Sequence, residues 1–440
     1  MMATTAAEIF MAQAPQVAAA LPWLADAAAL QNDKAVGWIK ALRATGAEAF
    51  AQTGLPTVAW EGWQYTNLRA LASSKFRYSA DPVKFDAAKI PAPLLGTHRV
   101  VLVNGQYQAK LSNLPEHVTV MSLMEAAEKN VAGIEEQLVT LGDLGKTPMT
   151  ALNAAYMRDG FVLVVAKNRD VADPIEVVFY NAGRDAAVYP RVMYRLGENA
   201  GCTVIERHCG EGAYFANTYA SITLESASRM RFYRFQEESN AGFHASNTVV
   251  QQQKDSNFEG FSLATGAKLA RQEFRLQLID RAISSSIGGT YLMKGQQSHD
   301  FTVLADHFEP DGKSVQHFKG VIDDQARAVY QGKIHVRRAA QKTDGYQSHH
   351  ALLLSPTAEA SAKPELEIYA DDVKCSHGAT AGQLNPEAIF YLRSRGIPHD
   401  LAKSLMVESF LGAAIEKVSY QPVRDIYLSR VSAWLAGRGA

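Results

Sequence analysis

The sequence predicts a mainly β protein with α-helical flanks, in which a central solenoid resembling a β-helix lies between two helical regions. Short runs rich in Val, Ile, Phe and Tyr, punctuated by Gly, Asn, Asp and Ser, fill roughly residues 98 to 370. The segments on either side have helical composition and spacing. Helical segments are not regularly interspersed among the strand-like runs, so a parallel sheet has to coil rather than alternate with helices.

The size and composition are those of an ordinary soluble globular protein with two or three structural units. The chain has 440 residues, of which 47% are hydrophobic and 20% charged. Its formal net charge of -1 provides no basic field for nucleic acid, and we expect no nucleic-acid partner. No apolar stretch is long enough to cross a membrane. The first residues lack the positively charged start of a signal peptide, and only three cysteines are present, so we expect a cytoplasmic protein.

The N-terminal region, residues 1–97, is expected to be helical over about residues 5 to 54. The stretch NDKAVGWIKALRATGAEAF predicts a helix capped by Asn32 or Asp33. After this helix, Trp60, Trp63 and Tyr65 lie close together in the sequence. We expect these aromatic residues to dock the N-terminal helices on the next structural unit.

The core region, residues 98–378, contains the strand-like runs. Similar polar turns recur along it, and several successive turns start about 27 to 29 residues apart. Two or three strands per coil would fill this spacing, which favours a solenoid. A pair of ordinary β-sandwiches is the alternative, because the period is irregular.

The C-terminal region, residues 379–440, is predicted to contain three helices. Asn385 and Pro386 begin the first helix, which ends before Gly396. The second begins near Pro398 or Asp400 and is apolar over more than one face, so it packs on its neighbours or on a partner. The third begins at Gln421.

Cys375 and His377, in the stretch ADDVKCSHGAT, are the candidate site residues. On a strand they share one face with Asp371 and Val373, with α-carbons about 6.5 Å apart, a separation that suits two ligands of one metal or cluster. Lys374 and a protonated His377 would favour the thiolate that such ligation requires. Two ligands do not complete a site, so further ligands come from neighbouring strands or from another chain.

Other interpretations of this pair stay open at the level of the residues. Both residues are structural, or they form a nucleophile and its base, which residues two apart on a strand are poorly placed to do. Candidate ligands within the chain are His335, His349 and His350, although His335 is better explained as a solvated residue of a basic strand. The remaining cysteines, Cys202 and Cys209, are expected to be buried.

The stretch LEIYADDVKCSHGATAGQLNPEAIFYLRSRG, from Leu366 to Gly396, closely resembles the signature of the SufB/SufD family, subunits of the SUF iron-sulfur cluster assembly scaffold. The resemblance extends over about residues 54 to 418. The form DDVKCSHGAT is similar to the SufD branch, because SufB paralogues have acidic and histidine residues in place of this thiol. Further blocks resemble the family in the expected order: WQYTNLRAL from Trp63, TPMTALNAAY from Thr147, HFKGVIDDQARAVYQGKIHV from His317 and QKTDGYQSHHALLLS from Gln341.

This resemblance implies a right-handed parallel β-helix core flanked by N-terminal and C-terminal helical regions. It also implies a non-catalytic scaffold subunit that pairs with a SufB-like paralogue through the β-helix. A transient iron-sulfur cluster would form at that interface, with Cys375 and His377 among its ligands. A SufC-like ABC-type ATPase would bind the C-terminal helices, and the expected docking residues are Leu401, Leu405, Met406, Phe410 and Ile415.

The sequence contains no phosphate-binding GxxxxGK[ST] loop, so ATP hydrolysis is expected in the SufC-like partner. It has no dinucleotide fingerprint after a strand, although a reduced flavin bound between chains of the complex would leave no motif here. One alternative function is a homodimeric metal-binding β-helix protein that uses Cys375 and His377 from two copies. A carbohydrate-acting β-helix enzyme is another, with Asp323–Asp324 or Asp371–Asp372 as its carboxylates.

Overall fold

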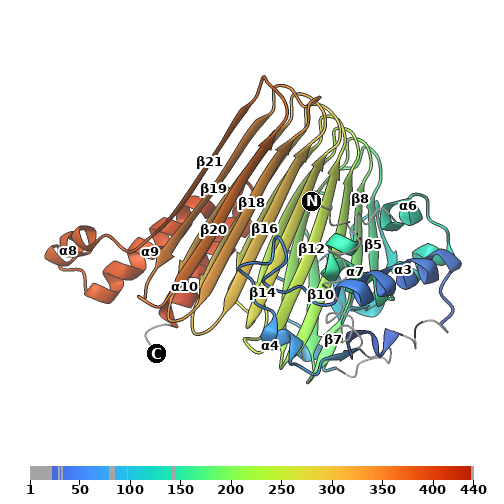
Figure 1. Cartoon of the computed structure of the whole chain (residues 1–440), viewed down its shortest axis with the longest axis horizontal. Coiled ribbons are helices and arrows are strands. Elements are labelled where there is room, and N and C mark those ends of the chain that lie inside the picture. The colour runs from blue at the N-terminus through green and yellow to red at the C-terminus, as the bar shows by residue number, and fades with distance from the viewer. Residues whose placement is uncertain are drawn as a thin grey trace, which may run out of the picture.

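The computed structural model shows a parallel β-helix with helices at both ends (Figure 1). Two long sheets, called sheet A and sheet B below, face each other along the whole β-helix. Along most of the β-helix, strands of the two sheets alternate in the sequence. The chain therefore passes from one sheet to the other and back in each coil. The described residues are 22–27, 30, 33–78, 85–96, 98–139 and 144–437.

The strands of the two sheets have the following bounds. Sheet A contains β1 (Arg77–Tyr78), β4 (Val118–Ser122), β5 (Gly160–Val165), β7 (Ala186–Val188), β8 (Arg191–Leu196), β10 (Tyr214–Leu224), β12 (Phe243–Gln252), β14 (Leu269–Leu278), β16 (Ser298–His307), β18 (Arg327–Val336) and β20 (Glu359–Ile368). Sheet B contains β2 (Arg99–Val103), β3 (Gln106–Tyr107), β6 (Ile175–Ala182), β9 (Gly201–Glu211), β11 (Arg229–Glu237), β13 (Asn257–Ala264), β15 (Ser284–Met293), β17 (Lys313–Ile322), β19 (Asp344–Leu353) and β21 (Lys374–Gly382).

The helices lie before, between and after these strands. The α-helices are α3 (Gly37–Thr53), α4 (Arg69–Ala72), α5 (Leu123–Glu128), α6 (Ile134–Val139), α7 (Pro148–Ala155), α8 (Pro386–Ser394), α9 (His399–Ile415) and α10 (Gln421–Ala436), with short 3₁₀ turns at Ala87–Lys89, Ala109–Leu111 and Leu144–Lys146.

The register of the strands confirms the solenoid, and it confirms the predicted period for the earlier coils. In sheet B, Gly201 pairs with Arg229 and Arg229 with Asn257, both in parallel, so each of these coils takes 28 residues. Consecutive coils therefore stack with matching residues above one another, and the interior is a continuous column. The alternative of two β-sandwiches is wrong, because their strands would be mainly antiparallel.

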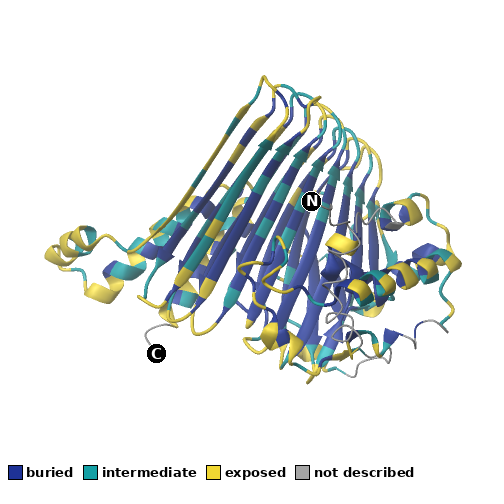
Figure 2. Cartoon of the chain, viewed as in Figure 1, coloured by how far each residue is buried: buried dark blue, intermediate teal, exposed yellow. Residues whose placement is uncertain are grey.

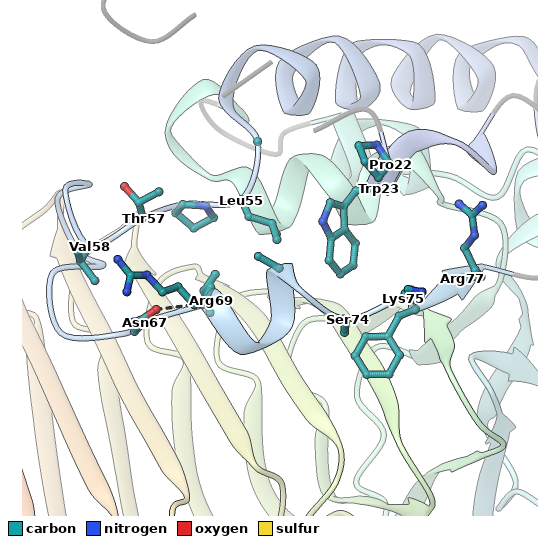
Figure 3. Close-up of a pocket in the computed structure, with 15 residues that line it drawn as sticks. Pro22, Trp23, Leu55, Thr57, Val58, Asn67, Arg69, Ser74, Lys75 and Arg77 are labelled. Carbon is teal, nitrogen blue, oxygen red and sulfur yellow. Dashed lines mark hydrogen bonds between the residues drawn. The ribbon is translucent and has the colours of Figure 1, made fainter. Parts of the chain in front are cut away.

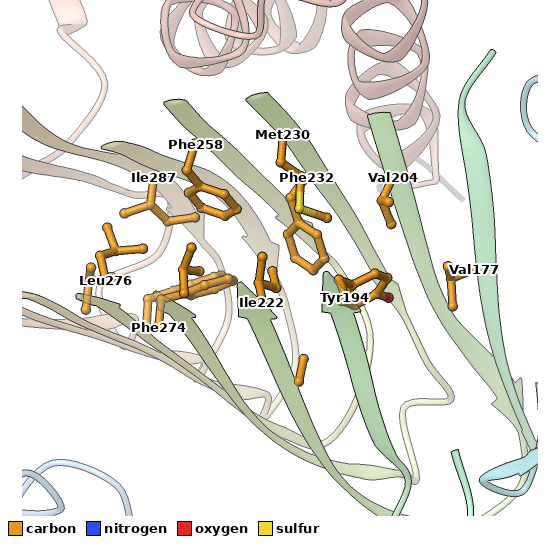
Figure 4. Close-up of a cluster of buried hydrophobic side chains, with 14 of the residues drawn as sticks. Val177, Tyr194, Val204, Ile222, Met230, Phe232, Phe258, Phe274, Leu276 and Ile287 are labelled. Carbon is orange, nitrogen blue, oxygen red and sulfur yellow. The ribbon is translucent and has the colours of Figure 1, made fainter. Parts of the chain in front are cut away.

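The interior between the sheets is mostly apolar (Figure 4). Val204, Phe232 and Phe258 lie on neighbouring strands of sheet B and face Ile222 and other apolar residues of sheet A. Such residues alternate with outward-facing ones along each strand. This alternation therefore determines which side chains face the interior and which face outward.

One part of the interior is ionic. Arg234 is fully buried and donates to Glu206 Oε2 at 2.9 Å, to Ser246 Oγ at 3.3 Å and to Thr248 Oγ1 at 3.0 Å. The second oxygen of Glu206 accepts a hydrogen bond from Tyr194 at 2.8 Å. Burial alone would raise the pKa of Glu206, but Arg234 and His208 together with Tyr194 lower that pKa to about 2. This carboxylate is therefore charged and paired inside the β-helix.

The segment around Trp63 packs on the outer face of sheet A, as the sequence analysis predicted for these aromatic residues. The guanidinium of Arg271 lies over the ring of the buried Trp63, 4.0 Å from its centroid. Asp300, which is also buried, accepts hydrogen bonds from Thr66 and from Arg271. Tyr65, in contrast, is exposed.

Two local features differ from the sequence-based expectations. Helix α3 begins at Gly37 after Val36, which offers no side-chain cap; Asp33 instead accepts from the backbone N–H of Ala35 and pairs with Arg43 at 2.8 Å. Asn32 lies outside the described residues. The helices α5, α6 and α7, between β4 and β5, were also not predicted. Their apolar side chains pack with α3 in one cluster against sheet A, a tertiary contact that local periodicity does not reveal.

The three predicted C-terminal helices are confirmed. The side chain of Asn385 caps α8 by accepting from the N–H groups of Glu387 and Ala388. Helices α9 and α10 pack on the outer face of sheet B, where the buried Tyr427 of α10 donates to the backbone oxygens of Arg234 and Phe261 at 3.2 and 3.1 Å. No helix of the described residues has the length and apolarity needed to span a membrane.

Replacing Asp300 by Asn is expected to destabilise the fold by about 2–3 kcal/mol, because the buried Arg271 loses the nearer of its two carboxylate partners and keeps only Glu273, at 3.5 Å. Urea unfolding measures the change. Asp311→Asn is the matched control, since Asp311 forms an exposed pair with Arg281 at 3.1 Å and should cost about 0–1 kcal/mol. Equal effects of the two substitutions would contradict the role given to Asp300.

Stability is also expected to fall as the pH drops below about 6.5. Burial lowers the pKa of His208, His299, His307 and His317 to about 4 and that of His349 to about 3. Between about pH 6.5 and 4 the unfolded chain binds protons that the folded chain does not, so each histidine lowers stability by up to about 1.4 kcal/mol per pH unit. Urea midpoints measured from pH 7.5 down to 5.5 should fall, and a flat profile would contradict this.

Candidate functional site

Strand β21, which carries both candidate ligands, is the last strand of sheet B (Figure 1). Within the described residues it pairs with β19 only, so the backbone groups on its other edge are open. Its counterpart in sheet A, β20, is likewise the last strand of its sheet. The last coil is more exposed than the coils before it (Figure 2). An open parallel edge of this length is a surface on which another chain can pair.

Cys375 lies on the inward face of β21. It pairs in register with Gly345 of β19 and packs against Ile334 and Leu366, which belong to the apolar interior of the last coils. The thiol is half-buried. It is therefore neither sealed in the core nor free at the surface.

His377 is exposed although it follows Cys375 on the same face of the strand. It pairs in register with Gln347 of β19, which is fully buried. Gln347 is covered by the following coil, whereas no coil follows β21 within the described residues. The imidazole therefore lies beside the thiol at the open end of the β-helix.

The surroundings of Cys375 do not favour the expected thiolate. Burial raises the pKa of Cys375 and Asp344 adds to this rise, although a hydrogen bond from the backbone of Gly345 acts in the opposite direction. Lys374 does not help, because alternation along the strand places its side chain on the other face. The thiol is thus protonated in the separate chain, and it has to lose its proton when it binds a metal.

The three candidate ligands elsewhere in the chain have other partners. His335 Nδ1 lies 2.9 Å from Asp306 Oδ1 on the outside of sheet A. His349 is buried, 2.6 Å from the hydroxyl of Tyr291, and His350 lies 2.7 Å from Thr380 Oγ1 on the outer face of sheet B. Among the described residues, no three His, Cys, Asp or Glu side chains are grouped so as to hold a metal ion.

Cys202, Cys209 and the pair Asp371–Asp372 lie outside the strand that carries this site. Cys202 and Cys209 are buried as expected, and burial raises the pKa of each to about 12. Asp371 and Asp372 lie in the turn before β21 rather than on the strand, so the expected shared face begins only at Cys375. In that turn the N–H of Asp372 donates to Gln341 Oε1 at 3.0 Å.

The residues expected to bind an ATPase occupy different sides of α9. Leu401 and Leu405 are 51% and 40% exposed. Met406 and Phe410 are half-buried, and the ammonium of Lys319 lies 4.7 Å from the ring centroid of Phe410. Ile415 is fully buried in the cluster that joins α9 to sheet B, so its side chain is not available to a partner in this structure.

Helix α8 carries two exposed aromatic residues that sequence reasoning did not single out. Phe390 is 73% and Tyr391 57% exposed, and α8 has no buried residue at all. The helix extends away from the β-helix at the end of the molecule where α9 also begins (Figure 1). Its short apolar run, IFYL, was the available signal.

Comparison with known proteins places the chain in a family. Residues 179–410 match the family model described as SUF system FeS cluster assembly, SufBD core domain, and residues 23–177 match the SufBD protein N-terminal region. An iron-sulfur cluster assembly SufBD family protein of Synechocystis is 31% identical over 86% of each chain. The iron-sulfur cluster assembly protein SufD of Escherichia coli is 28% identical over 88% of this chain and 90% of its own length. SufD of Bacillus subtilis is 25% identical over 71% and 72% of the two chains. The chain therefore belongs to the SufBD family of iron-sulfur cluster assembly proteins and is SufD-like.

Proposed function

We propose that this chain is a non-catalytic scaffold subunit that supplies half of the binding site for a nascent iron-sulfur cluster. The observation that carries the proposal is the position of Cys375 and His377, side by side on the inward face of a strand whose outer edge is open. The other candidate ligands, His335, His349 and His350, contact side chains elsewhere in the chain. A second chain would therefore provide the remaining ligands. A SufB-like paralogue is the partner that this family suggests.

Pairing at the open edge would prepare the half-site for iron. A partner strand that adds to β21 would satisfy the free backbone groups and cover the end of the β-helix, which excludes water from the two side chains. The raised pKa of Cys375 keeps the thiol protonated until iron arrives. Iron binding then displaces this proton to solvent, and the exposed His377 would bind the metal beside the thiolate.

A SufC-like ATPase is proposed to dock on the exposed apolar side chains of α8 and α9. Phe390 and Leu401 would be the central anchors, with Tyr391, Leu405 and Met406 around them. Closure of the ATPase subunits on ATP would pull on these helices and shift the β-helix interface, which exposes Cys375 and His377 to iron and sulfide. We place this assembly in the cytoplasm, where thiols such as Cys375 stay reduced.

Replacing His377 by Ala is expected to abolish cluster formation on the complex and to leave subunit assembly unchanged. The chain is co-purified anaerobically with SufB-like and SufC-like subunits, and the visible absorption of bound cluster is measured. Cys375→Ser should also reduce the cluster yield. The control is His117→Ala, since His117 is exposed in a loop before β4.

A normal cluster yield in the His377 variant would refute the ligand assignment. The alternative homodimer, in which two thiols and two imidazoles hold one ion, predicts something different. In that case the isolated chain would purify as a dimer with bound metal, and addition of the SufB-like subunit would not change the metal content.

Charge placed on the exposed face of α9 is expected to release the ATPase. Leu401→Asp should weaken binding of a SufC-like subunit at least about ten-fold, because the leucine is an apolar anchor that the substitution replaces with a charge that must be desolvated. Isothermal titration with the purified ATPase measures this. Leu428→Asp is the matched control, since Leu428 is an exposed leucine on α10. Equal losses in both variants would show that α9 is not the specific docking surface.

A further inference from the structure

A preformed groove lies in the N-terminal region, on the side of sheet A where α4 and β1 pack (Figure 3). Its volume is about 770 Å³, within the range of about 300–1,000 Å³ that is usual for ligand sites. It is built by the segment after α3, by α4 and by the residues around Trp23. The lining residues are Pro22, Trp23, Gly54, Leu55, Pro56, Thr57, Val58, Asn67, Leu68, Arg69, Ala72, Ser74, Lys75, Phe76 and Arg77.

The floor of this groove is apolar and rigid. Trp23 and Phe76 are buried, and each packs edge-on against a phenylalanine of sheet A: Trp23 against Phe215 with ring centroids 5.8 Å apart, and Phe76 against Phe243 at 5.6 Å. Leu55 lies beside Trp23 (Figure 3). Because sheet A holds both rings in place, an apolar ligand would meet a surface that does not have to reorganise.

The charged residues of the groove are all positive. Arg69 and Lys75 are exposed and form no ion pair within the described residues, and Arg77 has only a distant partner, Asp26 at 3.8 Å. The described residues that line the groove include no Asp or Glu. A chain with net charge -1 thus concentrates unneutralised positive charge around an apolar surface. Such a surface favours a ligand that is both apolar and anionic.

The positive charges lie at opposite ends of the groove. Arg69 lies near Val58 at one end, and Lys75 and Arg77 lie at the other, with Leu55 and Trp23 between them (Figure 3). Val58 is 50% exposed and extends the apolar surface beyond the floor. A single-headed anionic amphiphile would leave one of the two positive ends unpaired. The geometry instead matches a ligand with an acidic group at each end and apolar groups in the middle.

We propose that this groove binds a short peptide segment of another protein in which apolar side chains are flanked on both sides by acidic residues. The apolar side chains lie on Trp23, Leu55 and Phe76. The flanking carboxylates pair with Arg69 at one end and with Lys75 and Arg77 at the other. The proposal is independent of the proposed function, since the groove is built by the N-terminal region and contains neither candidate cluster ligand.

Fluorescence anisotropy with the full chain tests this. The probe is a fluorescein-labelled peptide in which a Leu-Phe-Leu centre has two glutamates at each end, and the comparison peptide has lysines in place of the glutamates. The glutamate peptide is expected to bind at least about ten-fold more tightly, and its affinity should fall as salt is added. Arg69→Glu and Lys75→Glu should each weaken it about ten-fold, and Val58→Asp should also weaken it.

Lys110→Glu is the matched control, because Lys110 is exposed in a separate 3₁₀ turn. The affinity of this variant for the glutamate peptide should equal that of the unchanged protein. Thermal unfolding confirms that each variant is folded. Equal binding of the two peptides, no binding of the glutamate peptide, or insensitivity to Arg69→Glu and Lys75→Glu would each overturn the proposal. Binding of phosphatidylserine vesicles without binding of the glutamate peptide would also overturn it, in favour of a lipid surface. The groove variants should leave the cluster yield on the complex unchanged. Failure of the peptide proposal can therefore be distinguished from failure of the proposed scaffold function.

Discussion

The last coil of the β-helix has a neighbouring coil on one side only, and this constraint determines the chemistry at β21. In the middle coils, inward-facing side chains are sealed by the coils before and after them, as Gln347 is. In the last coil the same inward positions are only half covered. Cys375 therefore keeps contact with the apolar interior while His377 reaches solvent. A residue pair that would be structural one coil earlier becomes available to a metal and to a partner at this position.

The ionic part of the interior explains how a column of stacked coils tolerates polar residues. Arg234 and Glu206 form a buried pair in which hydroxyl groups of Ser246 and Thr248 take up the remaining donors of the guanidinium. An ion pair satisfied in this way offsets much of its desolvation cost. Arg234 and Glu206 lie on adjacent strands of sheet B, and their hydrogen bonds to Ser246, Thr248 and Tyr194 reach sheet A, so the two sheets are joined by hydrogen bonds as well as by apolar packing.

Much of the fold was predictable from the sequence, because its signals are local. Alternating Val, Ile and Phe residues mark the strands, recurring turns give the length of a coil, and Asn385 with Pro386 marks the start of α8. The thiolate prediction failed for a reason that the sequence does not contain. Burial of Cys375 comes from Ile334 and Leu366, residues brought near only by the coiling, and the strand directs Lys374 away from the thiol. In the same way, Ile415 and Leu401 are both apolar residues of one predicted helix. Only the packing of that helix on sheet B makes Ile415 buried and leaves Leu401 exposed.

The packing of the C-terminal helices also determines how a force applied to them would reach the proposed ligands on β21. Tyr427 ties α10 to the backbones of β11 and β13, and α9 contacts β15 and β17 directly. These helices are therefore a rigid extension of sheet B rather than a hinged arm. Strand β17 pairs with β19, and β19 pairs with β21, so a displacement of α9 is passed through two strand ladders to Cys375. Helix α8 has no buried residue and contacts α9, so a partner that binds both helices would act on the same rigid body that carries the open edge.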